Sequence, residues 1–197
     1  EKSYPGYHFL FATREELPVN DEDAINAFFV KNVISHCINC AAYTAVDKAE
    51  TEPEEAFKIN AEAVKKLAEA CQSHEALFIH ISTDYVFNGE GSSPYSETDP
   101  TSPVSVYGSS KLKGEALARE YCEETIIIRT SWVYSRYGKN FVKTMMRLMA
   151  EKDSIGVVSD QFGAPTYASD LAEAILQIIN RFEKPASGIY HYSNLGL

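Results

Sequence analysis

Leu77-Phe78-Ile79-His80-Ile81-Ser82 is the stretch that decides the fold, because it is a short and almost unbroken apolar run. Such runs are typical of strands that are buried on both faces of a parallel sheet. Helical patterns precede it at 53–71 and follow it at 105–121. Strands that alternate with helices of this length indicate βαβ units. Such sheets bind their ligands at the carboxyl ends of the strands, where Ser82 lies.

The same alternation runs along the rest of the chain. We expect further strands at 7–12, 33–39, 125–129 and 189–192, and further helices at 21–31, 141–150 and 170–182. The pattern predicts an α/β fold, a Rossmann-like doubly wound parallel sheet in a single domain.

The spacing of the glycines differs from that of a usual dinucleotide-binding sheet. The ten glycines show no G-x-G-x-x-G, the turn with which a dinucleotide-binding sheet normally opens. Gly89-Glu90-Gly91 lies in a stretch rich in Gly, Ser, Pro and Asp, which is typical of a loop. We therefore expect the sequence to begin just after the first, glycine-rich unit.

Composition excludes two classes of partner. The 197 residues carry a formal net charge of −10, with 45% hydrophobic and 23% charged residues, which is an ordinary globular composition. A nucleic-acid-binding surface would need a basic face. No apolar run is long enough to span a bilayer, and residues 1–5 lack the apolar core of a secretory signal. We expect neither a nucleic-acid nor a membrane partner.

One C-x-x-C pair stands among the four cysteines. Cys37 and Cys40 could form a redox or metal pair, but in a predicted strand residues three apart face opposite sides. No second C-x-x-C or C-x-x-H completes a zinc set, and the five histidines show no ligand spacing. We expect no metal site and mostly structural histidines. Four reduced cysteines favour a cytoplasmic protein.

The most informative pair is Tyr107 and Lys111, in the stretch YGSSK. On a helix, residues i and i+4 share one face, so the Lys111 ammonium would favour the Tyr107 phenolate and lower its pKa. That would suit the phenol to acid catalysis near neutral pH, and a carbonyl that receives hydride needs such a proton donor. The alternative is a surface tyrosine beside a solvated lysine, because Y-x-x-x-K is a common pattern.

Further candidates follow the other predicted strands. Thr83 could donate a hydrogen bond to the same carbonyl oxygen, or could cap the strand end. Ala41 and Ala42 are small enough for a flat cofactor to lie against the backbone, or for close packing of strand and helix. Trp132 is the only tryptophan, and its ring suits stacking on a sugar or base, or an interior position.

Taken together, these segments resemble the extended short-chain dehydrogenase/reductase family and, within it, the dTDP-4-dehydrorhamnose reductases. The resemblance runs from about Leu17 to the C-terminus. Y-x-x-x-K is general to the superfamily, whereas the combination of AAYTAVDKAE (41–50), STDYVF (82–87) and TSWVYS (130–135) is far more specific. Other matching stretches are YGSSKLKGE (107–115), GKNFVKTM (138–145) and DQFGAPT (160–166).

The resemblance implies an NAD(P)-binding domain over 1–197 that includes part of a small substrate-binding region at about 135–197. It implies that Tyr107 donates the proton, that Lys111 holds the nicotinamide ribose and tunes Tyr107, and that Thr83 completes the catalytic triad. The other implied contacts are Ala42, Tyr43, Thr44 and Val19 for the dinucleotide, and Thr83, Asp84 and Trp132 for the sugar.

The implied reaction passes hydride from NADPH or NADH to the C4 ketone of dTDP-4-dehydro-L-rhamnose and gives dTDP-L-rhamnose. The implied partner is thus a small-molecule nucleotide sugar. Arg14 stands where NADP-preferring folds place a base for the 2′-phosphate, which favours NADPH, or it is an exposed loop residue. The resemblance leaves a homodimer open. Some relatives bind Mg²⁺ at a subunit contact, but no acidic cluster in the sequence supports a magnesium site.

Three departures from the family pattern matter, and the missing glycine-rich turn is the first. Pro18 stands where the family usually has Asp, so the contacts near the adenine, including that of Val19, stay open. The C-terminal substrate lobe is cut short after Tyr192-Ser193-Asn194. Without the glycine-rich turn as well, we expect this stretch of chain alone to bind dinucleotide poorly.

Two other functions stay open. The first is another reductase or epimerase of the same family, which would use the same Tyr-Lys chemistry on a different nucleotide sugar. Discrimination between these sugars would rest on Trp132 and residues 160–167. The second function is that of a non-catalytic regulatory protein on this fold. The regulatory subunit of methionine adenosyltransferase is similar around the S-x-D-Y-V-F and Y-x-x-x-K stretches, but it lacks the AAYTAVDKAE and TSWVY patterns.

Overall fold

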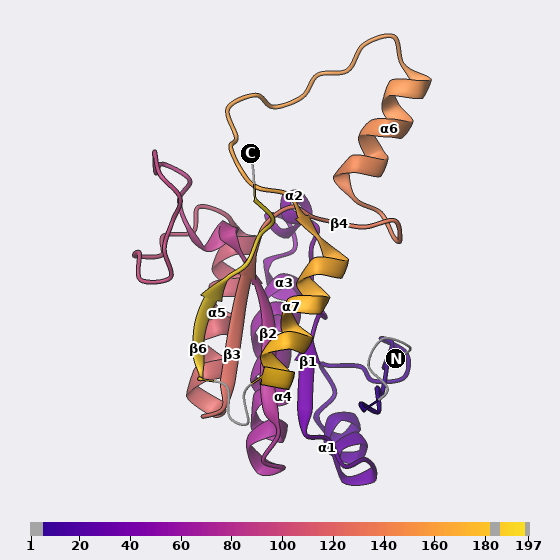
Figure 1. The fold of residues 1–197 in the computed structure, drawn as a ribbon, viewed down its shortest axis with the longest axis vertical. Coiled ribbons are helices and arrows are strands. Elements are labelled where there is room, and N and C mark those ends of the chain that lie inside the picture. Colours follow the sequence, from indigo (N-terminus) through magenta and orange to yellow (C-terminus); the bar gives the residue numbers. More distant parts are fainter. Residues whose placement is uncertain (1–5, 182–185, 196–197) are drawn as a thin grey trace.

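A parallel sheet forms the centre of the molecule, as Figure 1 shows. The computed structural model describes residues 6–181 and 186–195. Four strands pair in the order β1-β2-β3-β6, and all three pairings are parallel. The strands are β1 (His36–Asn39), β2 (Leu77–Thr83), β3 (Thr125–Thr130) and β6 (Gly188–His191). The predicted Rossmann-like α/β fold is confirmed.

Helices cover both faces of this sheet. Alternate residues of a strand face opposite sides of the sheet. Phe78 therefore packs in the core on one face, and Ile79 packs in the core on the other face. On the Phe78 side lie α1 (Glu22–Lys31), α4 (Ala63–Ser73) and α5 (Val106–Tyr121). On the Ile79 side, α7 (Ala168–Arg181) contributes Leu171 and Ile175 to the core.

The predicted helix at 53–71 is one continuous helical run with a wider turn in its middle. It consists of α3 (Pro53–Phe57), the π-helical η1 (Lys58–Glu62) and α4. Gly114 of α5 lies directly against the backbone of η1, because a Cβ at Gly114 would stand 2.1 Å from the Asn60 carbonyl oxygen. The absent side chain lets α5 and η1 approach closely.

Helix starts agree with the capping residues in the sequence. The Asp21 carboxylate accepts from the Ala24 N–H, and the Ser105 hydroxyl accepts from the Gly108 N–H. Both are N-caps, so α1 and α5 begin one residue later than their capping residues. This capping of α5 fixes the start of the helix that carries Tyr107 and Lys111.

The strand predicted at 7–12 is wrong, because these residues form no regular element. A strand needs a paired neighbour, and among the described strands β1 lies at the sheet edge and pairs only with β2. Phe9 and Phe11 instead stack on each other, with ring centroids 5.8 Å apart.

Other boundaries shift, and four short elements were not predicted. β1 is shorter than the predicted 33–39, and β6 lies one residue earlier than 189–192. The predicted end of α7 at residue 182 lies outside the described residues. The unpredicted elements are α2 (Val46–Ala49), η2 (Asp84–Val86), β4 (Val133–Tyr134) and β5 (Thr166–Tyr167).

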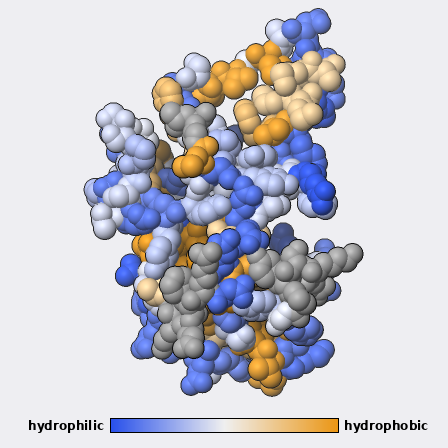
Figure 2. Space-filling model, viewed as in Figure 1, coloured by the Kyte–Doolittle hydropathy of each residue, from blue (hydrophilic) through white to orange (hydrophobic). Residues whose placement is uncertain are grey.

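One helix, α6 (Phe141–Glu151), stands apart from the sheet in Figure 1. None of its residues is buried, and apolar side chains gather on it and on the following segment in Figure 2. The exposed apolar residues of α6 are Phe141, Val142, Met146 and Met149. In the described part of the chain, no helix combines the length and the apolarity needed to cross a membrane.

Candidate functional site

A cavity of about 560 Å³ lies at the carboxyl edge of the sheet, between the strand ends, α5 and α7. Segments that follow three strands meet there with one face of α5. The cavity brings together most of the residues singled out in the sequence. These are Ala42, Thr44, Thr83, Asp84, Tyr107, Lys111 and Trp132.

Three other predicted residues do not line this cavity. The Tyr43 hydroxyl donates to the Glu52 carboxylate at 2.8 Å. Val19 packs at the margin of the core on the α1 side of the sheet. Arg14 lies exposed in a turn. Their predicted dinucleotide contacts stay predictions.

Tyr107 lies in the first turn of α5, with its ring edge-on to the Tyr85 ring at a centroid distance of 5.6 Å. Burial raises the pKa of Tyr107, and the nearby Asp84 carboxylate raises it further, while the interaction with Thr83 acts in the opposite direction. The predicted lowering of this pKa is therefore not seen. The phenol is held in its protonated form, which is the form that donates a proton.

Lys111 is 2% exposed, which is rare for a lysine. Its Nζ donates to the Ile81 carbonyl at 2.7 Å and lies 3.3 Å from His80 Nε2. Burial lowers the pKa of Lys111 to about 8, although the Glu115 carboxylate acts against this shift. The ammonium is thus directed toward the backbone of β2, which explains why it does not lower the Tyr107 pKa.

Thr83 and Asp84 form the polar end of β2. The Thr83 hydroxyl donates to an Asp84 carboxylate oxygen at 3.1 Å and accepts from the Tyr85 N–H at 3.2 Å. Burial raises the pKa of Asp84. The two side chains face the same cavity as Tyr107, so a hydroxyl, a carboxyl and a phenol converge on one space.

Trp132 adopts an unusual backbone conformation at the other side of the cavity, with a φ of 44°. Positive φ is uncommon for a bulky residue and often marks a functional site. The conformation is held by the Thr166 N–H, which donates to the Trp132 carbonyl, and by the pairing of β4 with β5. Gly163 lies against the indole, where a Cβ would stand 3.3 Å from the ring.

The model of the RmlD substrate binding domain family matches residues 2–197. The chain belongs to this family. It is 51% identical to the dTDP-4-dehydrorhamnose reductase of Escherichia coli (strain K12) over 156 residues, which cover 78% of the chain and 52% of that protein. It is 44% identical to the enzyme of that name from Aggregatibacter actinomycetemcomitans, over 95% of the chain and 65% of that protein.

A solved structure agrees with these sequence comparisons. The dTDP-4-dehydrorhamnose reductase from Bacillus anthracis, in complex with NADP, superposes with a TM-score of 0.92 at 39% identity, over 96% of the chain and 66% of that structure. The chain spans between half and two thirds of the length of the curated relatives cited above.

Sequence reasoning missed the residues that hold the loop after β1 in this member of the RmlD family. Asn60 is fully buried in η1. Its side-chain oxygen accepts from the Tyr43 N–H at 2.8 Å, and its side-chain NH₂ donates to the Tyr43 carbonyl at 3.0 Å. It also donates to the Ser110 hydroxyl of α5. The π turn that presents Asn60 is a known mark of functional regions, but it has no clear sequence signature.

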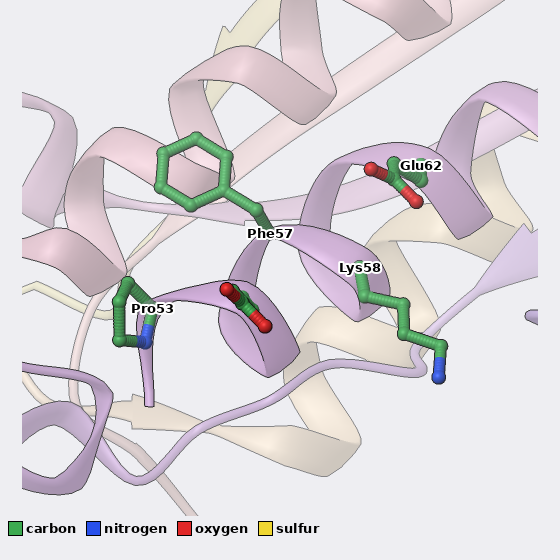
Figure 3. Close-up of a pocket in the computed structure, with 5 residues that line it drawn as sticks. Pro53, Phe57, Lys58 and Glu62 are labelled. Carbon is green, nitrogen blue, oxygen red and sulfur yellow. The ribbon is translucent and has the colours of Figure 1, made fainter. Parts of the chain in front are cut away.

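A second depression, on the surface of α3 and η1, carries no comparable chemistry. It is lined by Pro53, Glu54, Phe57, Lys58 and Glu62, and in Figure 3 the Lys58 side chain points away from Phe57 rather than toward a shared centre. Within the described ranges, no group of three or more His, Cys, Asp or Glu side chains could hold a metal ion. The four cysteines are free.

Proposed function

We propose that the intact protein is a reductase that transfers hydride from NADPH or NADH to the C4 ketone of dTDP-4-dehydro-L-rhamnose, giving dTDP-L-rhamnose. The observation that carries the proposal is the meeting of Thr83, Tyr107 and Lys111 with Trp132 at one cavity. The substrate class rests on the names of the relatives, which cover the chain at 44–51% identity.

In this reaction the chain's own residues manage the proton and the position of the ketone. The pKa of Tyr107 lies above its ordinary value of 10.0, so the phenol is protonated at neutral pH and its hydroxyl can donate to the ketone oxygen as hydride arrives at carbon. The Thr83 hydroxyl donates to Asp84 in this structure, and by turning its one hydrogen away from that carboxylate it can donate to the same ketone oxygen. Trp132 offers an aromatic face to the sugar.

The lining of the cavity fits the nicotinamide half of a dinucleotide, which would supply the hydride when bound. Ala42 and Thr44 present small side chains beside Lys111, so a flat ring and its ribose can approach the backbone. The NADP in the Bacillus anthracis structure supports NADPH as the cofactor. The four free cysteines favour the reducing cytoplasm as the location.

The test is NADPH oxidation by the intact protein with dTDP-4-dehydro-L-rhamnose, compared with its Tyr107→Phe variant. We expect the variant to lose activity by about 10²–10⁴-fold, the usual contribution of a general acid. Tyr121→Phe removes a hydroxyl from the far end of the same helix and serves as the matched control, with activity close to that of the wild type.

Each outcome discriminates between functions. Turnover that survives in Tyr107→Phe would remove Tyr107 as the acid. No turnover by an intact protein that binds NADPH would contradict the proposal and would point to another nucleotide sugar. Absence of both turnover and dinucleotide binding would favour a regulatory protein on this fold.

A further inference from the structure

Glu50 is an exposed carboxylate at the C-terminal end of α2, and it contacts a distant part of the chain. Its Oε1 accepts from the backbone N–H of Val106 at 2.8 Å, although the two residues are 56 positions apart in the sequence. Val106 is the first residue of α5, and Tyr107 is the second. The contact therefore reaches the turn that carries the phenol of the candidate site.

The first turn of a helix has backbone N–H groups that find no partner within the helix. In α5, the Ser105 hydroxyl accepts from the Gly108 N–H, and Glu50 accepts from the Val106 N–H. Ser105 belongs to the same segment as α5, so its cap fixes the residue at which the helix begins. Glu50 comes from another element, so its carboxylate ties the start of α5 to α2. A carboxylate at this end of a helix also interacts favourably with the helix dipole.

Contacts with two other elements limit the movement of the same turn. A Cβ at Gly108 would stand 2.2 Å from the Tyr85 carbonyl oxygen, so the turn lies directly against the backbone of η2. The Ser110 hydroxyl donates to the Tyr107 carbonyl and accepts from the Asn60 amide of η1. The contact from α2 thus adds a third element to those that hold this turn.

α2 is continuous with a part of the chain that lines the candidate cavity. Ala42, Thr44 and Val46 face that cavity, and Val46 is the first residue of α2. Ala49, the last residue of α2, is fully buried, and α2 packs against α5. One end of this short helix therefore lines the cavity, and Glu50 at its other end holds α5.

We propose that Glu50 is a positioning residue for Tyr107, because its carboxylate holds the first turn of α5 against α2 and so sets the place of the phenol relative to the cavity wall of Ala42, Thr44 and Val46. In the reductase proposed above, on which the catalytic consequence rests, this sets the proton donor relative to the nicotinamide. Glu50 itself does not line the cavity. A misplacement of about 1 Å can lower the rate of a chemical step by about 100-fold.

Glu50→Ala is the test variant, and Glu50→Gln is its conservative partner. The alanine removes the acceptor, and it opens no cavity in the core because Glu50 is exposed. The glutamine keeps a side-chain oxygen that can accept from the Val106 N–H, while it removes the charge. Glu120→Ala removes an exposed carboxylate from the far end of α5 and is the matched control.

The first measurement is amide hydrogen exchange in the intact protein, which needs no turnover. In Glu50→Ala we expect the Val106 amide to exchange about tenfold faster or more, because it loses its acceptor. The amides in the second half of α5 should be unchanged, which would show that the helix is intact. Glu50→Gln and Glu120→Ala should both match the wild type.

The second measurement is turnover in the proposed reaction. We expect Glu50→Ala to lower kcat by about tenfold while the KM for NADPH stays nearly unchanged. Glu50→Gln should restore most of the lost kcat. A residue with only a structural role would instead lower the folded fraction or weaken NADPH binding, and it would leave the kcat of the folded enzyme as it was.

Unchanged exchange of the Val106 amide in Glu50→Ala would overturn the proposal, and so would a kcat equal to that of Glu120→Ala. A Glu50→Gln variant as impaired as Glu50→Ala would also contradict it, because the hydrogen bond would then not be what matters. If the wild type shows no turnover, the reductase function fails. The exchange of the Val106 amide then decides alone whether Glu50 holds the turn of Tyr107.

Discussion

At the residue scale, the buried charge of Lys111 lowers the free energy of unfolding, and the pH dependence of stability should reveal this effect. Burial lowers its pKa from the ordinary 10.5 to about 8. Below pH 8 the folded and unfolded chains both hold the proton, and the buried charge costs about 3 kcal/mol. Between pH 8 and 10.5 the unfolded chain binds more protons than the folded one, so this group makes stability rise with pH in that window.

Lys111→Met should therefore raise the free energy of unfolding at pH 7, by about 1–3 kcal/mol once the lost hydrogen bond to Ile81 is included. Urea unfolding between pH 7 and 10.5 measures this. The gain should shrink through the upper part of the range. Lys113→Met, at an exposed position of the same helix, should give no comparable gain. A Lys111→Met variant that is less stable than wild type throughout would contradict the account.

At the residue scale, the sequence predicted the site residues best where a polar or aromatic side chain follows a strand, or where a reactive pair shares one face of a helix. Thr83, Tyr107 and Trp132 all face the cavity. Two features could not be predicted. The direction of the Lys111 ammonium depends on the Ile81 carbonyl and on His80, and the direction of the Tyr43 side chain depends on Glu52. The direction of each of these side chains depends on neighbouring residues that only the folded chain brings together.

At the scale of elements, one buried cluster joins the parts that carry the site. The Glu115 carboxylate of α5 accepts from Arg129 Nε at 2.9 Å and from its terminal nitrogen at 2.7 Å, both on β3. It also accepts from the Ser82 hydroxyl of β2. The two charged side chains are only 4% and 3% exposed. The cluster thus fixes the helix of Tyr107 against the strands that end at Thr83 and Thr130.

Arg129→Met should lower the free energy of unfolding by about 3–5 kcal/mol, because it leaves the Glu115 carboxylate buried without its cation. Adding Glu115→Gln should recover more than half of that loss, since no uncompensated charge then stays buried. Chemical denaturation of both variants checks this. Arg147→Met, which breaks the exposed pair with Glu151, should change stability very little. A double variant no more stable than Arg129→Met would contradict the prediction.

Elements with strong local signals were predicted from the sequence, and elements that depend on distant partners were not. α1 and α5 carry an amphipathic or polar pattern and a capping residue, Asp21 or Ser105, within one segment. The two-residue strands β4 and β5 exist only through their mutual pairing. The run at 7–12 has strand-like residues but no strand beside it in the described sheet.

At the scale of the whole molecule, the site is a product of the parallel sheet. The ends of β1, β2 and β3 lie at one edge because the three strands run in the same direction. α5 adds Tyr107 and Lys111 from one side, and α7 closes the cavity with Ala168, Leu171 and Ile175. Residues from 40 to 175 along the chain therefore meet in one space.

The most direct test of the reductase function follows the hydride itself. NADPH carrying deuterium at C4 of the nicotinamide would be supplied to the intact protein with dTDP-4-dehydro-L-rhamnose, and the product examined by NMR. We expect deuterium at C4 of the rhamnose from one of the two NADPH epimers and none from the other, because a single cavity presents one face of the cofactor. A sugar product without cofactor-derived deuterium, or one that gains deuterium only from deuterated water, would contradict the account.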